Sequence, residues 1–156
     1  MSSYSLRILK KINKEIKEDN SFPSKNNKRD WVFANGDYKS LNKHTDIPDS
    51  EQGKWLIFTR ELYVDGMWHK IMDVYKTGAL IGGAGGKCST KKSHVINPDG
   101  KYVIVIYCLN EEQKCHNRKT LREILGITWK IPYKLEKDTG IKYSWDGDRN
   151  ISKYFE

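Results

Sequence analysis

Two stretches in the body of the chain carry apolar residues at three- and four-residue steps, the spacing of one face of an α-helix. In the first stretch, Asp65 is available as N-cap and Gly78 as C-terminal stop. The second stretch follows Asn110, which has Gln113 at the spacing of a capping box, and it ends at Gly126. The pattern therefore predicts two amphipathic helices in this part of the chain.

Short apolar runs with β-branched and aromatic residues lie between polar turn segments, and these runs predict strands. The predicted strands cover residues 30–34, 54–59, 87–90, 101–108 and 130–135. The turn residues 97–100 make the strands at 87–90 and 101–108 antiparallel neighbours, and Pro132 favours a sheet edge for the last strand. The order of elements predicts an α+β fold, with helices packed on one face of a mainly antiparallel sheet.

The N-terminal residues differ from the rest of the chain. Residues 1–20 combine helical apolar spacing with lysines at many of the positions between, which predicts an amphipathic helix with a basic face. Residues 21–29 are polar and contain Pro23, so they predict a loop. We therefore expect an N-terminal helix and loop over residues 1–29 and a single α+β domain over residues 30–156. The helix either lies on the domain with its lysines in water or binds a protein partner or a membrane surface.

The net charge of the chain predicts which kind of partner it binds. The 156 residues include 28 Lys and Arg against 20 Asp and Glu, a formal net charge of +8. This balance favours anionic partners, which include nucleic acid, phosphate groups and acidic substrates. Only 37% of the residues are hydrophobic, so the core must come from a few dense apolar stretches.

Apolar runs and cysteines bear on the compartment. No run approaches the roughly 18 apolar residues of a membrane span, and the N-terminus lacks the unbroken apolar region of a secretory signal. The cysteines are odd in number and have no C-x-x-C spacing, so they encode neither a disulfide framework nor a zinc ribbon; they are Cys88, Cys108 and Cys115. We expect a cytoplasmic protein with reduced thiols and no membrane partner.

A glycine-rich segment at residues 82–86 precedes Lys87 and raises the question of a phosphate-binding loop. The nucleotide-triphosphatase pattern fails, because Ile81 replaces its first glycine and Cys88 replaces its Ser or Thr. The residues that follow, GKCSTKK, read as a strand rather than the required helix. Two interpretations remain open: an anion-facing strand and loop, or a solvated basic hairpin, both carrying Lys87, Lys91 and Lys92.

Histidines and tryptophans are the remaining chemical candidates. No pair among the four histidines has metal-ligand spacing, so we expect neither metal nor cofactor. Among five tryptophans, Trp55 and Trp68 lie in strongly patterned elements and are expected in the core. Trp31 and Trp145 lie in weakly patterned polar segments, so they are the better candidates for stacking on a nucleobase.

Between residues 53 and 145 the chain carries, in order, the motifs GKWLIF, VDGMWHKI, IGGAGGKCST, YVIVIYCLN and LREILGITWKIPYKLEKDTGIKYS. Together these motifs resemble the basophilic leukaemia expressed protein family, a eukaryotic family whose fold is similar to that of translation initiation factor 4E. The resemblance implies a curved antiparallel sheet, backed by helices, with a concave basic side. In cap-binding proteins of that fold, two tryptophans sandwich a methylated guanine and basic residues meet the phosphates. Residues 44–52, where the second tryptophan would lie, hold no aromatic side chain beyond His44.

The leading hypothesis is a non-enzymatic binding protein with a basic concave cleft for a phosphate-bearing ligand, either a nucleotide or an RNA end. The predicted ligand-binding residues are Trp31, Lys87, Ser89, Thr90, Lys91, Lys92, Lys134 and Tyr143. One alternative is a phosphoesterase or other hydrolase with His94 or His44 as general base. Another is a protein-interaction module that docks through the basic N-terminal helix or through the helices that back the sheet.

Overall fold

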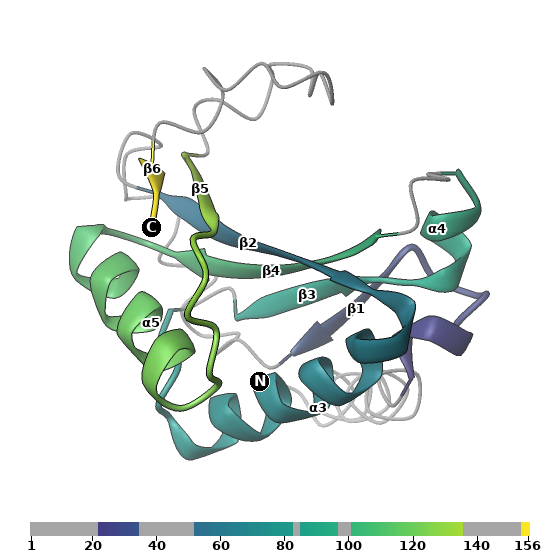
Figure 1. Ribbon diagram of the computed structural model, residues 1–156, viewed down its shortest axis with the longest axis horizontal. Coiled ribbons are helices and arrows are strands. Elements are labelled where there is room, and N and C mark those ends of the chain that lie inside the picture. The colour runs from purple at the N-terminus through teal and green to yellow at the C-terminus, as the bar shows by residue number, and fades with distance from the viewer. Residues whose placement is uncertain (1–21, 35–51, 83–84, 97–100, 136–153) are drawn as a thin grey trace, which may run out of the picture.

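Six antiparallel strands form one sheet in the computed structural model, which describes residues 22–34, 52–82, 85–96, 101–135 and 154–156. The strand order is β1-β3-β4-β2-β5-β6 (Figure 1). The strands are β1 (Trp31–Ala34), β2 (Gly53–Arg60), β3 (Gly86–Ser89), β4 (Lys101–Cys108), β5 (Pro132–Leu135) and β6 (Tyr154–Phe155). The prediction of an α+β fold built on an antiparallel sheet is confirmed.

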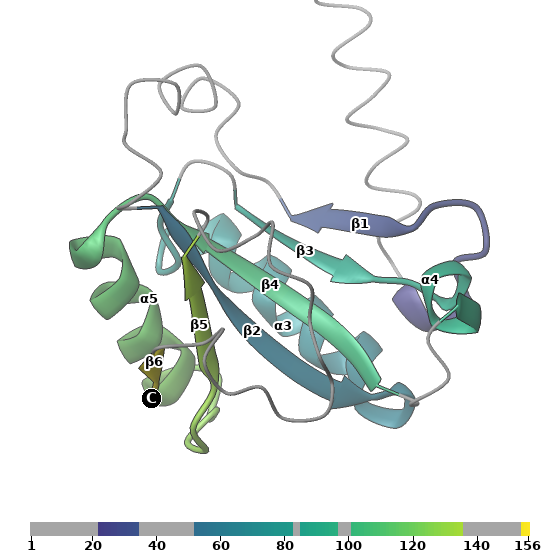
Figure 2. The same cartoon turned by 90° about the horizontal axis from the view of Figure 1, so that it is seen from above.

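Two long helices cover one face of this sheet. They are α3 (Glu61–Thr77), which contacts β1, β2 and β4, and α5 (Glu111–Glu123), which contacts β2 and β4. Figure 2 looks onto the sheet from the opposite side, with α3 behind the strands. A short helix α4 (Lys91–Ile96) and a 3-10 turn η1 (Pro23–Lys25) lie together beside the C-terminal end of β3. The helices therefore leave the second face of the sheet uncovered by any described helix.

The two faces of the sheet follow from the register of β2 and β4, which pair over their full lengths. Trp55 and Ile57 alternate with Ile104 and Ile106 on the face toward the helices, where all four are fully buried. The indole Nε1 of Trp55 donates to the carbonyl of Lys114 in α5 at 3.0 Å, which identifies this as the helix-covered face. The residues between them in each strand belong to the other face.

The predicted strands are all present, with ends shifted by at most a few residues. β3 and β4 are antiparallel neighbours as predicted. The expectation that Pro132 lies at the sheet edge is wrong, because Pro132 pairs with Phe155 of β6. The two residues of β6 come from the far end of the chain and carry too little pattern to predict a strand.

The start of α3 differs from the prediction. The helix begins at Glu61, so Asp65 lies inside it and does not cap it. The Asp65 carboxylate instead accepts hydrogen bonds from the backbone N–H and hydroxyl of Ser24 and so fixes the η1 turn. Leu62 and Tyr63 of the first turn are hydrophobic but exposed, so they lie outside the buried stripe that begins at Val64 and do not mark the start of the helix. The C-terminal stop is confirmed, since Gly78 has φ +79°.

The N-terminus of α5 forms as predicted. The Asn110 side chain accepts from the backbone N–H of Gln113 at 2.9 Å. The Gln113 side chain reaches back to accept from the N–H of Leu109 at 2.8 Å, one residue earlier than in a standard capping box. The helix ends at Glu123, shortly before Gly126, whose φ is +69°.

The expectation that Lys91 and Lys92 continue a strand is wrong, because both residues begin α4. The Thr90 hydroxyl donates to the carbonyl of Arg29, and the Ser93 hydroxyl donates to the carbonyl of Asp30. These bonds to residues far away in the chain turn the backbone out of β3. The predicted helix at residues 1–20 lies outside the described residues. Residues 22–29 pack against α3 and α4 through η1.

Candidate ligand-binding face

The register of β1, β3 and β4 brings several predicted site residues to the sheet face opposite the helices. Trp31 of β1 pairs with Ser89 of β3. Lys87 lies two residues before Ser89 in the same strand and therefore faces the same side, and it pairs with Val105 of β4. Paired residues of antiparallel strands lie on the same face. The same face receives Lys54 and Lys134, because these two pair across β2 and β5. We call this surface the open face because no described helix packs against it; Leu56 and Val105 at its middle are nevertheless buried.

Lysine and aromatic side chains alternate along the open face. The Nζ of Lys87 lies 4.1 Å from the centre of the Trp31 ring and 5.7 Å from that of Tyr107. The Nζ of Lys54, in the strand on the other side of β4, lies 5.8 Å from the centre of the Tyr107 ring. All four side chains are half-buried. Ammonium groups within about 6 Å of a ring centre are attracted by its π-electrons, so these contacts favour the placement of the cations beside the rings.

Two of these four residues, Lys54 and Tyr107, were not among the predicted site residues. Each belongs to a strand whose apolar run dominates the local pattern, so the sequence assigns its side chain to a strand and not to a binding site. The signal was present in the alternation of KWLIFT and KYVIVIY, in which these residues occupy the face opposite the most apolar one. Only the strand order β3-β4-β2 brings Lys54 and Tyr107 beside Lys87, and local sequence patterns do not predict that order.

Lys134 occupies the expected face but is only 3% exposed. Its neighbours across the middle of the open face, Leu56 and Val105, are also buried. Tyr143, another predicted ligand-binding residue, lies outside the described residues. Lys54 is therefore the more accessible cation on this side of the face.

The hydroxyl groups of Ser89 and Thr90 are engaged within the protein. The Ser89 Oγ accepts from the backbone N–H of Val103 at 2.8 Å, and the Thr90 hydroxyl donates to the carbonyl of Arg29. Both residues are buried. These hydrogen bonds connect the C-terminal end of β3 to β4 and to the segment before β1. The Ser and Thr of this motif therefore have a structural role.

Lys91 and Lys92 are exposed on α4, beyond the end of β3. The Nζ of Lys92 donates to the carbonyl of Lys28 at 3.5 Å, and its backbone N–H donates to the carbonyl of Asn26 at 3.1 Å. The structure thus separates these two lysines from the row formed by Lys87, Tyr107 and Lys54, since they lie on a different element at the end of the sheet.

The glycines before Lys87 are explained by packing. A Cβ on Gly86 would lie 2.7 Å from the carbonyl oxygen of Val105 and 3.0 Å from the hydroxyl of Tyr75. The N–H of Gly85 donates to the carbonyl of Gly82, and the Gly85 carbonyl accepts from Tyr107. The Gly85 N–H therefore has a partner within the protein and is not one of the free N–H groups that a phosphate-binding loop offers.

Two of the cysteines, Cys88 and Cys108, are buried, and this burial determines the chemistry of their thiols. Burial raises the pKa of the Cys108 thiol to about 12 and that of the Cys88 thiol well above its usual value. Both thiols are therefore neutral near pH 7, which makes them poor nucleophiles and poor metal ligands. Within the described ranges, no three His, Cys, Asp or Glu side chains gather closely enough to hold a metal ion.

The histidines proposed as general bases are only partly placed. His94 belongs to α4, where its backbone alone is described, and His44 lies outside the described residues. His69 and His116 are exposed. The His69 ring lies tilted against that of Phe22, with ring centres 5.7 Å apart, and the His116 Nε2 lies 2.9 Å from the carbonyl of Ala79. The hydrolase hypothesis stays a prediction.

Comparison with known proteins adds no relative: the chain matches no protein-family model and no curated protein. In the part of the chain that the structure covers, no helix has the length and apolar character needed to cross a membrane.

Proposed function

We propose that this protein binds a phosphate-bearing ligand, either a nucleotide or an RNA end, on the open face and performs no chemistry on it. The observation that carries the proposal is the alternation of Trp31, Lys87, Tyr107 and Lys54 over four adjacent strands. Two cations provide charge for phosphates and two rings provide surfaces for a base, which is the combination that single-stranded nucleic-acid binding uses.

Electrostatics supports the same assignment. The chain carries a formal charge of +8, which draws anions toward it from solution. At the open face, the lysines are held against rings in a half-buried setting, where charge interactions are screened less than in water. An initiation-factor-4E-like fold, which is part of this proposal, would use the same side of its sheet for a nucleotide.

A thermal-shift screen tests the proposal. The probes are ATP, GTP, a cyclic dinucleotide and a capped dinucleotide at low salt, with inorganic phosphate as control. A nucleotide that binds only the native state raises the unfolding midpoint by mass action, and inorganic phosphate raises it much less because it has no base to stack. Binding must also weaken as salt increases, since bound phosphates release counterions. If every probe leaves the midpoint unchanged, or if the affinity is independent of salt, the proposal is wrong.

A further inference from the structure

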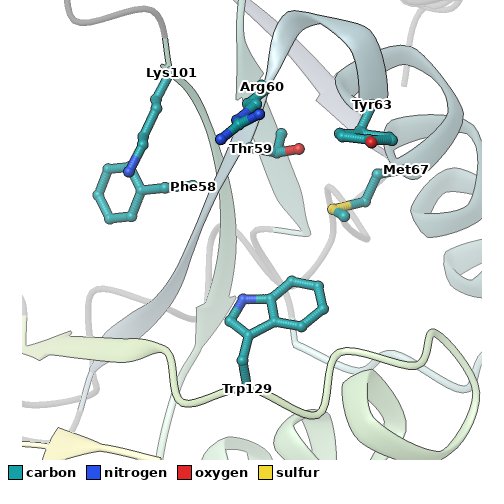
Figure 3. A pocket seen from close by; sticks show the side chains of 7 residues that line it. All are labelled: Phe58, Thr59, Arg60, Tyr63, Met67, Lys101 and Trp129. Atoms are coloured by element: carbon teal, nitrogen blue, oxygen red, sulfur yellow. The ribbon is translucent and has the colours of Figure 1, made fainter.

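A cavity at the C-terminal end of β2 forms a second candidate site, away from the lysines and rings of the open-face row. Its volume is about 470 Å³, within the range of roughly 300–1,000 Å³ found for small-molecule sites in proteins. The side chains of Arg60, Tyr63, Met67, Lys101 and Trp129 are among those that line it (Figure 3). Arg60 follows Lys54 of the row by six residues of β2, a separation of about 20 Å along a strand.

Two aromatic rings and a thioether provide the apolar part of the cavity. Tyr63 and Met67 lie one turn apart on α3, so both are on the same side of this helix. The Trp129 ring points into the space from the segment before β5 (Figure 3). Tyr63 is 58% exposed and Trp129 49% exposed, so a ligand with a flat apolar body would remove part of both rings from water. This lining favours an aromatic ligand, since rings and sulfur also attract one another.

Hydrogen bonds on both sides of Trp129 fix the backbone that carries it. Two nitrogens of the buried Arg118 guanidinium donate to the carbonyls of Ile127 and Trp129 at 3.0 and 2.8 Å. Two residues after Trp129, the N–H of Ile131 donates to the carbonyl of Glu156 at 2.8 Å and the Ile131 carbonyl accepts from Glu156 at 3.1 Å. The wall of the cavity is therefore formed before a ligand binds, which lowers the entropic cost of binding.

Two cations provide the charged part of the cavity. Arg60 and Lys101 lie directly opposite each other in the β2–β4 register, where like charges repel. Glu61, next to Arg60, accepts a hydrogen bond from the Tyr102 hydroxyl at 3.3 Å. Among the residues that the structure describes, no carboxylate forms an ion pair with either cation. An anionic group of a ligand would relieve the repulsion, and a carboxylate matches the parallel N–H groups of an arginine.

We infer that this cavity binds a small aromatic carboxylate, whose ring system contacts Tyr63 and Trp129 and whose carboxylate lies beside Arg60 and Lys101. The apolar contacts supply most of the affinity, as in small-molecule sites generally. The two cations select an acid over a neutral molecule of the same shape. The inference is independent of nucleotide binding at the open face, because it uses other residues.

The experiment uses the full chain labelled with ¹³C at its methionine methyl groups, and its probe is 2-naphthoate. Met67 lines the cavity, whereas Met72 of the same helix does not and serves as internal control; Met67→Leu identifies the signal. Titration with 2-naphthoate should shift the Met67 methyl signal and leave that of Met72 in place. The amide 2-naphthamide has the same ring system without the charge, so it should bind at least about tenfold more weakly. Acetate, which has the charge without the rings, should leave both signals in place.

Charge variants separate the two cations from general attraction. Arg60→Gln and Lys101→Gln should each weaken binding of 2-naphthoate by about five- to tenfold and change binding of 2-naphthamide by less than about twofold. A merely structural role of either residue would weaken binding of both probes alike. Lys119→Gln, an equal charge change on an exposed position of α5, should change neither affinity by more than about twofold.

A ring variant tests the apolar wall. Trp129→Ala should weaken both probes by about tenfold or more, since each loses the same ring contact. Ile124→Ala is its control, because Ile124 is also an exposed apolar side chain and does not line the cavity; it should leave both affinities within about twofold. The inference is overturned if 2-naphthoate does not shift the Met67 signal, if 2-naphthamide binds as tightly, or if Lys119→Gln or Ile124→Ala has the effect of its partner variant.

Discussion

The ammonium group of Lys87 lies 4.1 Å from the centre of the Trp31 ring, across the junction of β1 and β3. The two residues are diagonal neighbours, because Trp31 is paired with Ser89 and Lys87 with Phe33. This arrangement gives the tryptophan ring a cation at its face and gives the lysine a fixed position near Tyr107. The pair is the most direct place at which to test the proposed function.

We expect Lys87→Met to weaken binding of the nucleotide that the thermal screen identifies by roughly tenfold. The change removes one cation that neutralises phosphate, so the slope of log affinity against log salt should become shallower by about one. The measurement is an equilibrium titration at several salt concentrations.

Lys119→Met is the matched control for this experiment, since it removes the same charge from an exposed position of α5. It should leave the affinity within about twofold and the slope unchanged. An equal loss in the two variants would mean that binding depends on net charge alone and that the open face has no special part.

Gly86 and Gly66 should respond in opposite directions to alanine. The Cβ of Gly86→Ala meets the Val105 carbonyl oxygen at 2.7 Å, so the neighbouring strand must move, and we expect a loss of about 1–3 kcal/mol in the free energy of unfolding. Gly66 lies within α3 with no atom within 4 Å of the new Cβ, so Gly66→Ala should gain about 0.5–1 kcal/mol. Urea denaturation measures both. A stabilised Gly86→Ala would contradict the packing account of the glycine-rich segment.

Arg118→Lys should destabilise the protein by about 2–3 kcal/mol. The guanidinium is 3% exposed and donates from three nitrogens to the carbonyls of Ile127, Trp129 and Glu156. A lysine ammonium is a single point charge that cannot span these three acceptors, and each lost bond leaves a carbonyl without its charged donor. Urea denaturation gives the free energy of unfolding.

Arg122→Lys provides the control for Arg118, because Arg122 is exposed one turn further along α5. Its effect should stay within about 0.5 kcal/mol. Similar losses of stability in the two variants would show that the three hydrogen bonds from the Arg118 guanidinium do not stabilise the fold specifically.

Cys108 should make stability fall as the solution becomes alkaline. Its pKa is raised by burial to about 12 in the folded protein, against an ordinary value of 9.0. Between these two values the unfolded chain loses the thiol proton and the folded chain keeps it, so the free energy of unfolding decreases as pH rises through this window. Cys108→Ala removes this contribution, and its stability should decrease less steeply between about pH 8 and pH 11.

Cys115→Ala is the comparison for the alkaline series, since Cys115 is exposed. Urea midpoints across the pH range should give the wild-type slope for this variant. The comparison uses slopes because Cys108→Ala also loses buried volume at every pH. A wild-type slope in Cys108→Ala would show that the buried thiol does not contribute.

The candidate site was only partly predictable from the sequence. Trp31 and Lys87 were selected because aromatic and basic residues suggest nucleotide binding, and the structure brings them together on the open face. Lys91 and Lys92 were selected for charge alone, and a helix start places them elsewhere. Lys54 and Tyr107 join the row only through the order β3-β4-β2, which depends on contacts between residues far apart in the chain.

Local patterns determined the elements of this protein, and its tertiary structure decided how their faces combine. Short apolar runs determined β2 and β4, and the Asn110 side chain determined the start of α5, because these signals act between near neighbours. The η1 turn, the short β6 and the path of the chain into β5 depend on Ser24, Glu156 and Arg118, whose partners lie outside their own helix or strand. Such contacts have no sequence spacing of their own, since only the folded chain brings the partners together.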